Sequence, residues 1–100
     1  MFQKLLLTNL FLLSLQLGFA QTAILRGTVT AADNNAAITD ASVVLAQTGL
    51  FGATDARGAF ILFEVPPGEY TIVVTRAGFL PFEQKTSLQA GQDFQLNISM

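Results

Sequence analysis

Hydrophobic and polar residues alternate in short runs along most of the chain. In residues 24–30, Leu25 and Val29 fall on one side of an extended segment, whereas Arg26 and Thr28 fall on the other. A period of two is typical of a strand with one buried face. Further short runs, each bounded by turn residues, occupy residues 41–46, 50–54, 59–63, 70–75, 83–88 and 94–99, and the alternation is clear at 70–75 and 94–99. The pattern predicts seven short strands and shows no helical period after residue 20.

Turn-forming residues separate these strands at a spacing of roughly 8–12 residues, which is typical of a sandwich or barrel. We therefore predict an all-β fold, a seven-stranded antiparallel β-sandwich with Greek-key connections. Gly27 interrupts the first strand, and a glycine there marks a bulge or the close approach of another backbone more often than a binding site. The expected core consists of Leu25, Val29, Val43, Leu45, Phe60, Leu62, Tyr70, Ile72, Val74, Leu96 and Ile98.

Two turns organise the middle of the chain, and we assign their residues structural roles. In residues 54–58, Asp55 can accept a hydrogen bond from the backbone two residues further on, and Gly58 can adopt the positive φ that closes the turn. In residues 65–68, two prolines fix φ and lack the N–H that a strand ladder needs. Both turns are expected to be hairpin bends. The residues assigned to them are Thr54, Asp55, Gly58, Pro66, Pro67 and Gly68.

Residues 1–20 have the pattern of a helical secretory signal peptide. Lys4 supplies the positive charge, residues 5–17 are almost wholly apolar, and Gly18 and Ala20 are small residues at the −3 and −1 positions of a cleavage site. A transmembrane anchor is the alternative, but the apolar run is shorter than the ~20 residues that span a bilayer. The sequence thus predicts a signal peptide at 1–20 and an exported domain at 21–100.

The composition argues against several classes of function. Five Lys and Arg residues are opposed by seven Asp and Glu residues, and the resulting net charge of −2 is scattered along the chain. Without a basic stripe, nucleic acid is not an expected partner. The chain contains neither histidine nor cysteine, so the commonest general base, nucleophile and metal ligands are missing. We expect no enzymatic activity, no catalytic residue, no cofactor and no metal.

Carboxylates are the remaining groups that could carry chemistry. Asp55 lies at a turn, Glu64 and Glu69 flank the two prolines and could face each other, and residues 33–35 (Asp-Asn-Asn) contain oxygen ligands of the kind that calcium prefers. The EF-hand loop pattern that ends in glutamate is absent. Solvated loop and turn roles are therefore the simpler interpretation of all these residues.

The chain has more large apolar residues than a small sandwich needs inside. In residues 59–63 both faces of the strand are apolar, which is unusual for an antiparallel strand with one solvated face. If several of these side chains share a face outside the core, they form a contact surface for a partner domain or protein. The alternative, equally open, is that the sandwich packs them inside. The residues concerned are Phe51, Ile61, Phe63, Phe79 and Phe82, together with Leu50.

Several motifs together resemble the carboxypeptidase regulatory-like domain. They occupy residues 27–29, 41–45, 52–60, 65–70 and 77–79. The most specific element is Thr-Asp-x-x-Gly-x-Phe followed by Pro-Gly-x-Tyr, and the resemblance extends over about residues 24–99. It implies a prealbumin-like (transthyretin-like) sandwich. It says almost nothing about ligands, because every motif residue has a turn or core role.

Domains of this family often follow a signal peptide at the N-terminus of TonB-dependent outer-membrane receptors, which import glycans, peptides or chelated metals. The resemblance implies a non-catalytic accessory module at the periplasmic face of the outer membrane. Its partners would be the plug and barrel of the same receptor or another periplasmic protein, and it would meet the membrane only through the rest of a longer chain. Two alternatives stay open. One is a secreted or surface module for glycan binding or adhesion, and the other is a non-catalytic domain beside a metallocarboxypeptidase.

Overall fold

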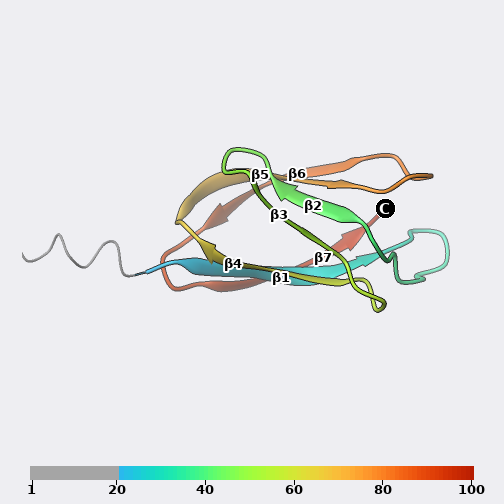
Figure 1. Ribbon diagram of the computed structural model, residues 1–100, viewed down its shortest axis with the longest axis horizontal. Coiled ribbons are helices and arrows are strands. Elements are labelled where there is room, and N and C mark those ends of the chain that lie inside the picture. The colour runs from blue at the N-terminus through green and yellow to red at the C-terminus, as the bar shows by residue number, and fades with distance from the viewer. Residues whose placement is uncertain (1–20) are drawn as a thin grey trace, which may run out of the picture.

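The computed structural model describes residues 21–100, which form seven β-strands and, within that range, no helix (Figure 1). The strands are β1 (Ala23–Thr30), β2 (Ser42–Leu45), β3 (Leu50–Ala53), β4 (Ala59–Val65), β5 (Gly68–Thr75), β6 (Phe82–Leu88) and β7 (Asp93–Ser99). Each predicted strand has a counterpart whose ends differ by no more than two residues. The predicted signal peptide lies outside the described residues. Between residues 21 and 100, no helix has the length and apolar character that crossing a membrane requires.

Two sheets pack face to face as a sandwich (Figure 1). One has the strand order β4-β1-β7 and the other β3-β2-β5-β6, which confirms the predicted all-β sandwich. One detail of the prediction was wrong, because β1 and β7 run parallel, whereas the other strand pairs are antiparallel. Hydrophobic alternation shows which face of a strand is buried. It carries no information about the direction of a partner strand far away in the sequence.

The two central turns join strands of different sheets. Residues 54–58 carry the chain from β3, in the four-stranded sheet, to β4, in the three-stranded sheet. Residues 66–67 carry it back to β5. The expected hairpin bends were therefore wrong, since a hairpin pairs successive strands within one sheet. Turn residues reverse the chain but do not specify the sheet that the next strand joins.

The core lies between the two sheets and contains ten of the eleven expected residues. Leu96 is the exception: it is only partly buried and packs against the core from the edge strand β7. A side chain on an edge strand has a neighbouring strand on one side only, so it is less completely covered than a side chain on a central strand. Further buried apolar residues complete the core, namely Ala23, Ala31, Ile38, Ala41, Val65 and Leu88.

A β-bulge lets β4 bury side chains that are three residues apart. Leu25 of β1 pairs with Leu62, but Ala23, two residues earlier, pairs with Val65, so β4 contains one extra residue. Glu64 lies in the bulge with a φ of 53°, and this left-handed conformation strains any residue that has a Cβ. The bulge restores the inward direction at Val65, and both Leu62 and Val65 are buried.

Replacing Glu64 with glycine is therefore expected to relieve backbone strain. Glu64→Gly should be more stable than Glu64→Ala by about 1 kcal/mol, because glycine adopts positive φ without a steric penalty. The two variants share the loss of the exposed carboxylate, so their difference isolates the backbone. Urea denaturation measures the difference, and equal midpoints would contradict the observed conformation.

Candidate functional site

The turn at residues 54–58 is held together by the carboxylate of Asp55. Its Oδ1 atom accepts hydrogen bonds from the backbone N–H of Arg57 at 2.8 Å and of Ala59 at 2.9 Å. Gly58 has a φ of 75°, and its N–H donates to the carbonyl of Asp55. One oxygen of the carboxylate is thus bound by two N–H groups of its own loop, which is a structural arrangement.

The same hydrogen bonds give the protein an acid-dependent contribution to stability. The N–H groups of Ala59 and then Arg57 favour the ionised carboxylate and hold the pKa of Asp55 below its usual value of 3.8. The stability that comes from a lowered pKa is fully present above the unfolded-state pKa and is lost as the pH falls through the folded-state pKa.

We expect Asp55→Ala to lower the melting temperature at pH 7. The difference from the parent protein should shrink below about pH 3.8, and a difference independent of pH would contradict this role.

Thr54 is the one buried polar residue of the described chain, with only 4 % of its surface exposed. Its Oγ1 donates a hydrogen bond to the carbonyl of Ile38 at 2.6 Å and accepts one from the N–H of Ala41 at 2.9 Å. The hydroxyl therefore ties the end of β3 to the segment that leads into β2. The sequence pattern placed Thr54 in the turn but did not reveal this contact, because it does not show that residues 38–41 lie beside it.

The proline turn is held by a second side chain. The Tyr70 hydroxyl donates a hydrogen bond to the carbonyl of Pro66, and the ring of Tyr70 is buried in the core. Tyr70 thus couples the start of β5 to the crossing between the sheets. A Cβ added to Gly68 would lie 3.5 Å from this hydroxyl oxygen.

The other carboxylates do not gather into a reactive cluster. In residues 21–100, no group of three or more Asp or Glu side chains is placed to hold a metal ion. Glu64 and Glu69 are both exposed. In the loop at 33–35, Asn34 accepts a hydrogen bond from the N–H of Ala36 at 3.0 Å, and Asn35 has a positive φ of 60°. These residues shape a turn.

The expected apolar patch divides into two parts. Phe51 on β3 is 73 % exposed, and Phe63 and Ile61 on β4 are 59 % and 38 % exposed. These strands are the edges of the two sheets and contact each other. A Cβ on Gly52 would lie only 3.1 Å from Leu62. We call Phe51, Ile61 and Phe63 the edge patch.

The remaining residues of that expectation lie elsewhere. Phe79 is in the connection between β5 and β6, beside the loop of residues 31–39. Its neighbour Leu80 is 87 % exposed and was missed, because a proline-containing connection gives no pattern of burial. Phe82 and Leu50 are partly buried and pack against the core, so the structure places them in the sandwich. In the alternation of their strands, these two side chains face the core.

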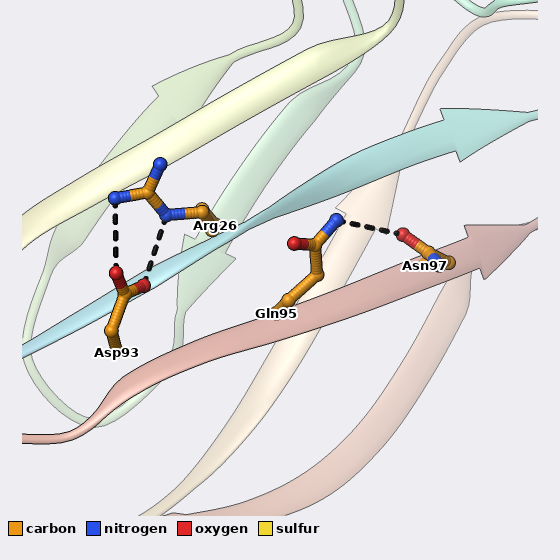
Figure 2. A network of polar contacts seen from close by, with 4 residues as sticks. All are labelled: Arg26, Asp93, Gln95 and Asn97. Atoms are coloured by element: carbon orange, nitrogen blue, oxygen red, sulfur yellow. Dashed lines mark hydrogen bonds and ion pairs between the residues drawn. The ribbon is translucent and has the colours of Figure 1, made fainter.

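A polar network covers the outer face of the three-stranded sheet (Figure 2). Arg26 on β1 forms a two-point ion pair with Asp93 on β7, with Nε···Oδ1 and Nη2···Oδ2 distances of 2.9 and 3.2 Å. The Thr28 hydroxyl donates to Asn97 at 3.2 Å, and the Gln95 amide donates to the same oxygen at 3.4 Å. The sequence alone does not reveal this network, because its members meet only through the parallel β1–β7 pair.

A shallow hollow of about 580 Å³ lies beside this network. Its polar walls come from Arg26, Thr28 and Gln95, and its apolar wall includes Ile61 from the edge patch. The hollow combines hydrogen-bonding groups with an apolar side chain, a combination that can hold a polar ligand against a flat surface.

The fold and these surfaces define a β-sandwich module whose turn residues bind its own backbone. The family model for the carboxypeptidase regulatory-like domain matches residues 24–100, and the chain belongs to this family. A comparison with curated protein sequences finds no significant match.

Solved structures support the fold. Two interface mutants of a type II cohesin–X–dockerin complex from Acetivibrio cellulolyticus each contain a chain with a TM-score of 0.65 and 22 % identity, and the match covers 78 % of this chain and 56 % of that one. A "putative carbohydrate binding protein" from Bacteroides uniformis has a TM-score of 0.61 and 14 % identity, over 79 % of this chain and 41 % of that chain. This chain thus spans about half the length of these structural neighbours, and the likeness concerns the fold alone.

Proposed function

We propose that this chain is a non-catalytic interaction module, the N-terminal periplasmic extension of a TonB-dependent outer-membrane receptor for nutrient uptake. Family membership over residues 24–100 supports the module, and the secretory pattern of residues 1–20 supports export. The edge patch is the observation that supports an interaction role. It places two exposed phenylalanines where the edges of both sheets meet.

Docking at the edge patch would bury apolar surface that the module itself leaves in water. Phe51 and Phe63 are each more than half exposed. Covering both contributes about 3 kcal/mol, before the cost of ordering the partner. The partner would be the plug of the same receptor or another periplasmic protein. The hydrogen-bonded turn at Asp55 borders β4 and holds one end of this edge in place.

Serine substitutions separate docking from folding. Phe51→Ser with Phe63→Ser should leave the melting temperature of the purified chain nearly unchanged, because these rings lie largely in water. Phe82→Ser should destabilise the fold by about 2 kcal/mol, since Phe82 packs against the core. In cells whose growth depends on the receptor, we expect the double variant to reduce uptake at equal receptor abundance. Normal uptake by the double variant would argue against docking through this patch.

The receptor context has its own test, which is the coding sequence after Met100. A TonB-box-like segment followed by a plug and a transmembrane barrel is the expected result. A stop codon directly after Met100 would contradict the receptor context and favour a secreted or surface module. A zinc-peptidase motif in the same reading frame would instead favour a domain beside a metallocarboxypeptidase.

Glycan binding is the second candidate, and the hollow beside Arg26, Thr28 and Gln95 is the observation in its favour. Planar amide and guanidinium groups next to an apolar side chain can bind sugar hydroxyls and a sugar face. Binding would raise the melting temperature in the presence of oligosaccharide. Gln95→Ala should abolish that rise if the hollow is the site, whereas no rise with any oligosaccharide leaves protein docking as the function.

A further inference from the structure

The outer side of β7 is a free strand edge. The N–H of Ile24 donates to the carbonyl of Gln92 at 2.8 Å, and the N–H of Met100 donates to the carbonyl of Thr30 at 2.9 Å. In a parallel ladder, residues alternate between bonding the partner and facing away from it. The residues of β7 that bond β1 are therefore the even-numbered ones. The N–H and C=O groups of Asp93, Gln95, Asn97 and Ser99 point away, where no strand of residues 21–100 lies.

The other three edges of the sandwich are protected against strand addition, whereas this one is not. β3 has only four residues, β4 contains the bulge at Glu64, and β6 carries the charged residues Glu83 and Lys85. Short length, bulges and charges are the usual means of blocking such an edge. From residue 94 to residue 99, β7 has no charge, proline or register shift. Its only charge, on Asp93, is paired with Arg26.

The inner face of this edge is apolar and incompletely covered. Phe94, Leu96 and Ile98 alternate with the polar residues of β7, and both Phe94 and Leu96 are only partly buried against the core. A strand placed beside β7 with the same alternation would cover these two side chains. It would also extend the polar outer face of the sheet.

We propose that the occupant is a second copy of this chain, whose β7 pairs antiparallel with the first in a register centred on Leu96. That register places Gln95 opposite Asn97 of the second copy and Asp93 opposite Ser99. All residues whose backbone groups face outward then meet each other in hydrogen-bonded pairs. Leu96 meets its own counterpart, and Phe94 meets Ile98, so apolar residues lie opposite apolar residues throughout.

The charges favour this self-pairing. In the centred register the two Asp93 carboxylates lie at opposite ends of the ladder, about 20 Å apart, and each is already neutralised by Arg26. No like charges are opposite each other, and like charges in that position oppose pairing. The pairing joins two three-stranded sheets into one of six strands. It leaves the edge patch free, because β4 lies at the other edge of the sheet.

Charge substitutions at positions 95 and 97 test both the edge and the register. Gln95 and Asn97 are exposed, so their replacement leaves the core intact. Gln95→Lys with Asn97→Lys puts two pairs of lysines opposite each other. Gln95→Lys with Asn97→Glu instead puts each lysine opposite a glutamate of the second copy. The two variants share the first substitution, and they differ in the sign of the cross-strand pairs.

The measurement is sedimentation of the purified chain, expressed from Met1 so that the host processes any leader, over concentrations from about 1 µM to about 1 mM. We expect a concentration-dependent dimer for the parent protein, dimerisation weakened about tenfold or more by the lysine pair, and dimerisation retained by the lysine–glutamate pair. Thermal unfolding verifies that both variants fold. A parent protein that stays monomeric overturns the proposal. This holds even if β7 pairs with a strand of another protein instead. A dimer equally insensitive to both variants overturns it as well.

Discussion

Replacing Gly27 with alanine is expected to remove a large part of the stability of the domain. A Cβ at this position would lie 1.7 Å from the carbonyl oxygen of Leu96 and 3.0 Å from the ring of Phe60. The first of these contacts is with the backbone of the adjacent strand, which cannot rotate away. Overpacking of a core costs about 1–3 kcal/mol or more, and we expect Gly27→Ala to lie at or above 3 kcal/mol. A domain of this size has only about 4–12 kcal/mol in total.

Gly78→Ala is the matched control. A Cβ on Gly78 would have no neighbouring atom within 4 Å, but the φ of this residue is +91°. A Cβ at this position strains the backbone but causes no steric clash, so Gly78→Ala should lower the free energy of unfolding by about 1 kcal/mol. Urea denaturation of both variants gives the comparison. Equal losses would show that β7 does not approach β1 as closely at Gly27 as the structure indicates.

Thr54→Val is expected to have the next largest effect. Valine has nearly the same shape but no hydroxyl, so the carbonyl of Ile38 and the N–H of Ala41 would lose their partner in a buried place. Each buried group left without a hydrogen bond costs about 1–3 kcal/mol. We expect a loss of about 3 kcal/mol in the free energy of unfolding, measured by urea denaturation.

Thr54→Ser separates the hydroxyl from the methyl group. Serine keeps both hydrogen bonds and loses one buried methyl, so the expected loss is about 1 kcal/mol. Serine should therefore be clearly more stable than valine at this position. The reverse order would mean that the side chain acts through packing and that its hydrogen bonds matter little.

Local features of this fold could be predicted from the sequence, because they depend on nearby residues. Alternation located the strands and ten of the core residues, and the Asp-x-x-Gly pattern located a turn whose carboxylate binds its own backbone. Gly27 was expected to mark a bulge or the close approach of another backbone, and the second of these holds, because Gly27 lies against the carbonyl of Leu96. In each case the physical cause is either the backbone geometry of one residue or the alternation of side chains along a strand.

Features that depend on distant residues could not be predicted. The direction of β7 relative to β1, the crossing of both central turns between sheets, and the bonds of Thr54 to residues 38–41 all follow from topology. The apolar patch shows the same limit. Phe51, Ile61 and Phe63 lie on two edge strands, β3 and β4, that contact each other, whereas Phe82 packs against the core from β6. A sequence pattern gives the number of apolar residues but not their neighbours.

The central claim is that this module works by contact through the edge patch. The most direct test places a photo-crosslinking amino acid at Phe63, with Lys85 on the outer face of the other sheet as the control position, in cells that export the natural full-length product. Both side chains are exposed, so both report on accessible partners. We predict crosslinks from position 63 to the plug of the same receptor or to another periplasmic protein, and none from position 85. The same products from both positions, or none from position 63, would contradict the claim.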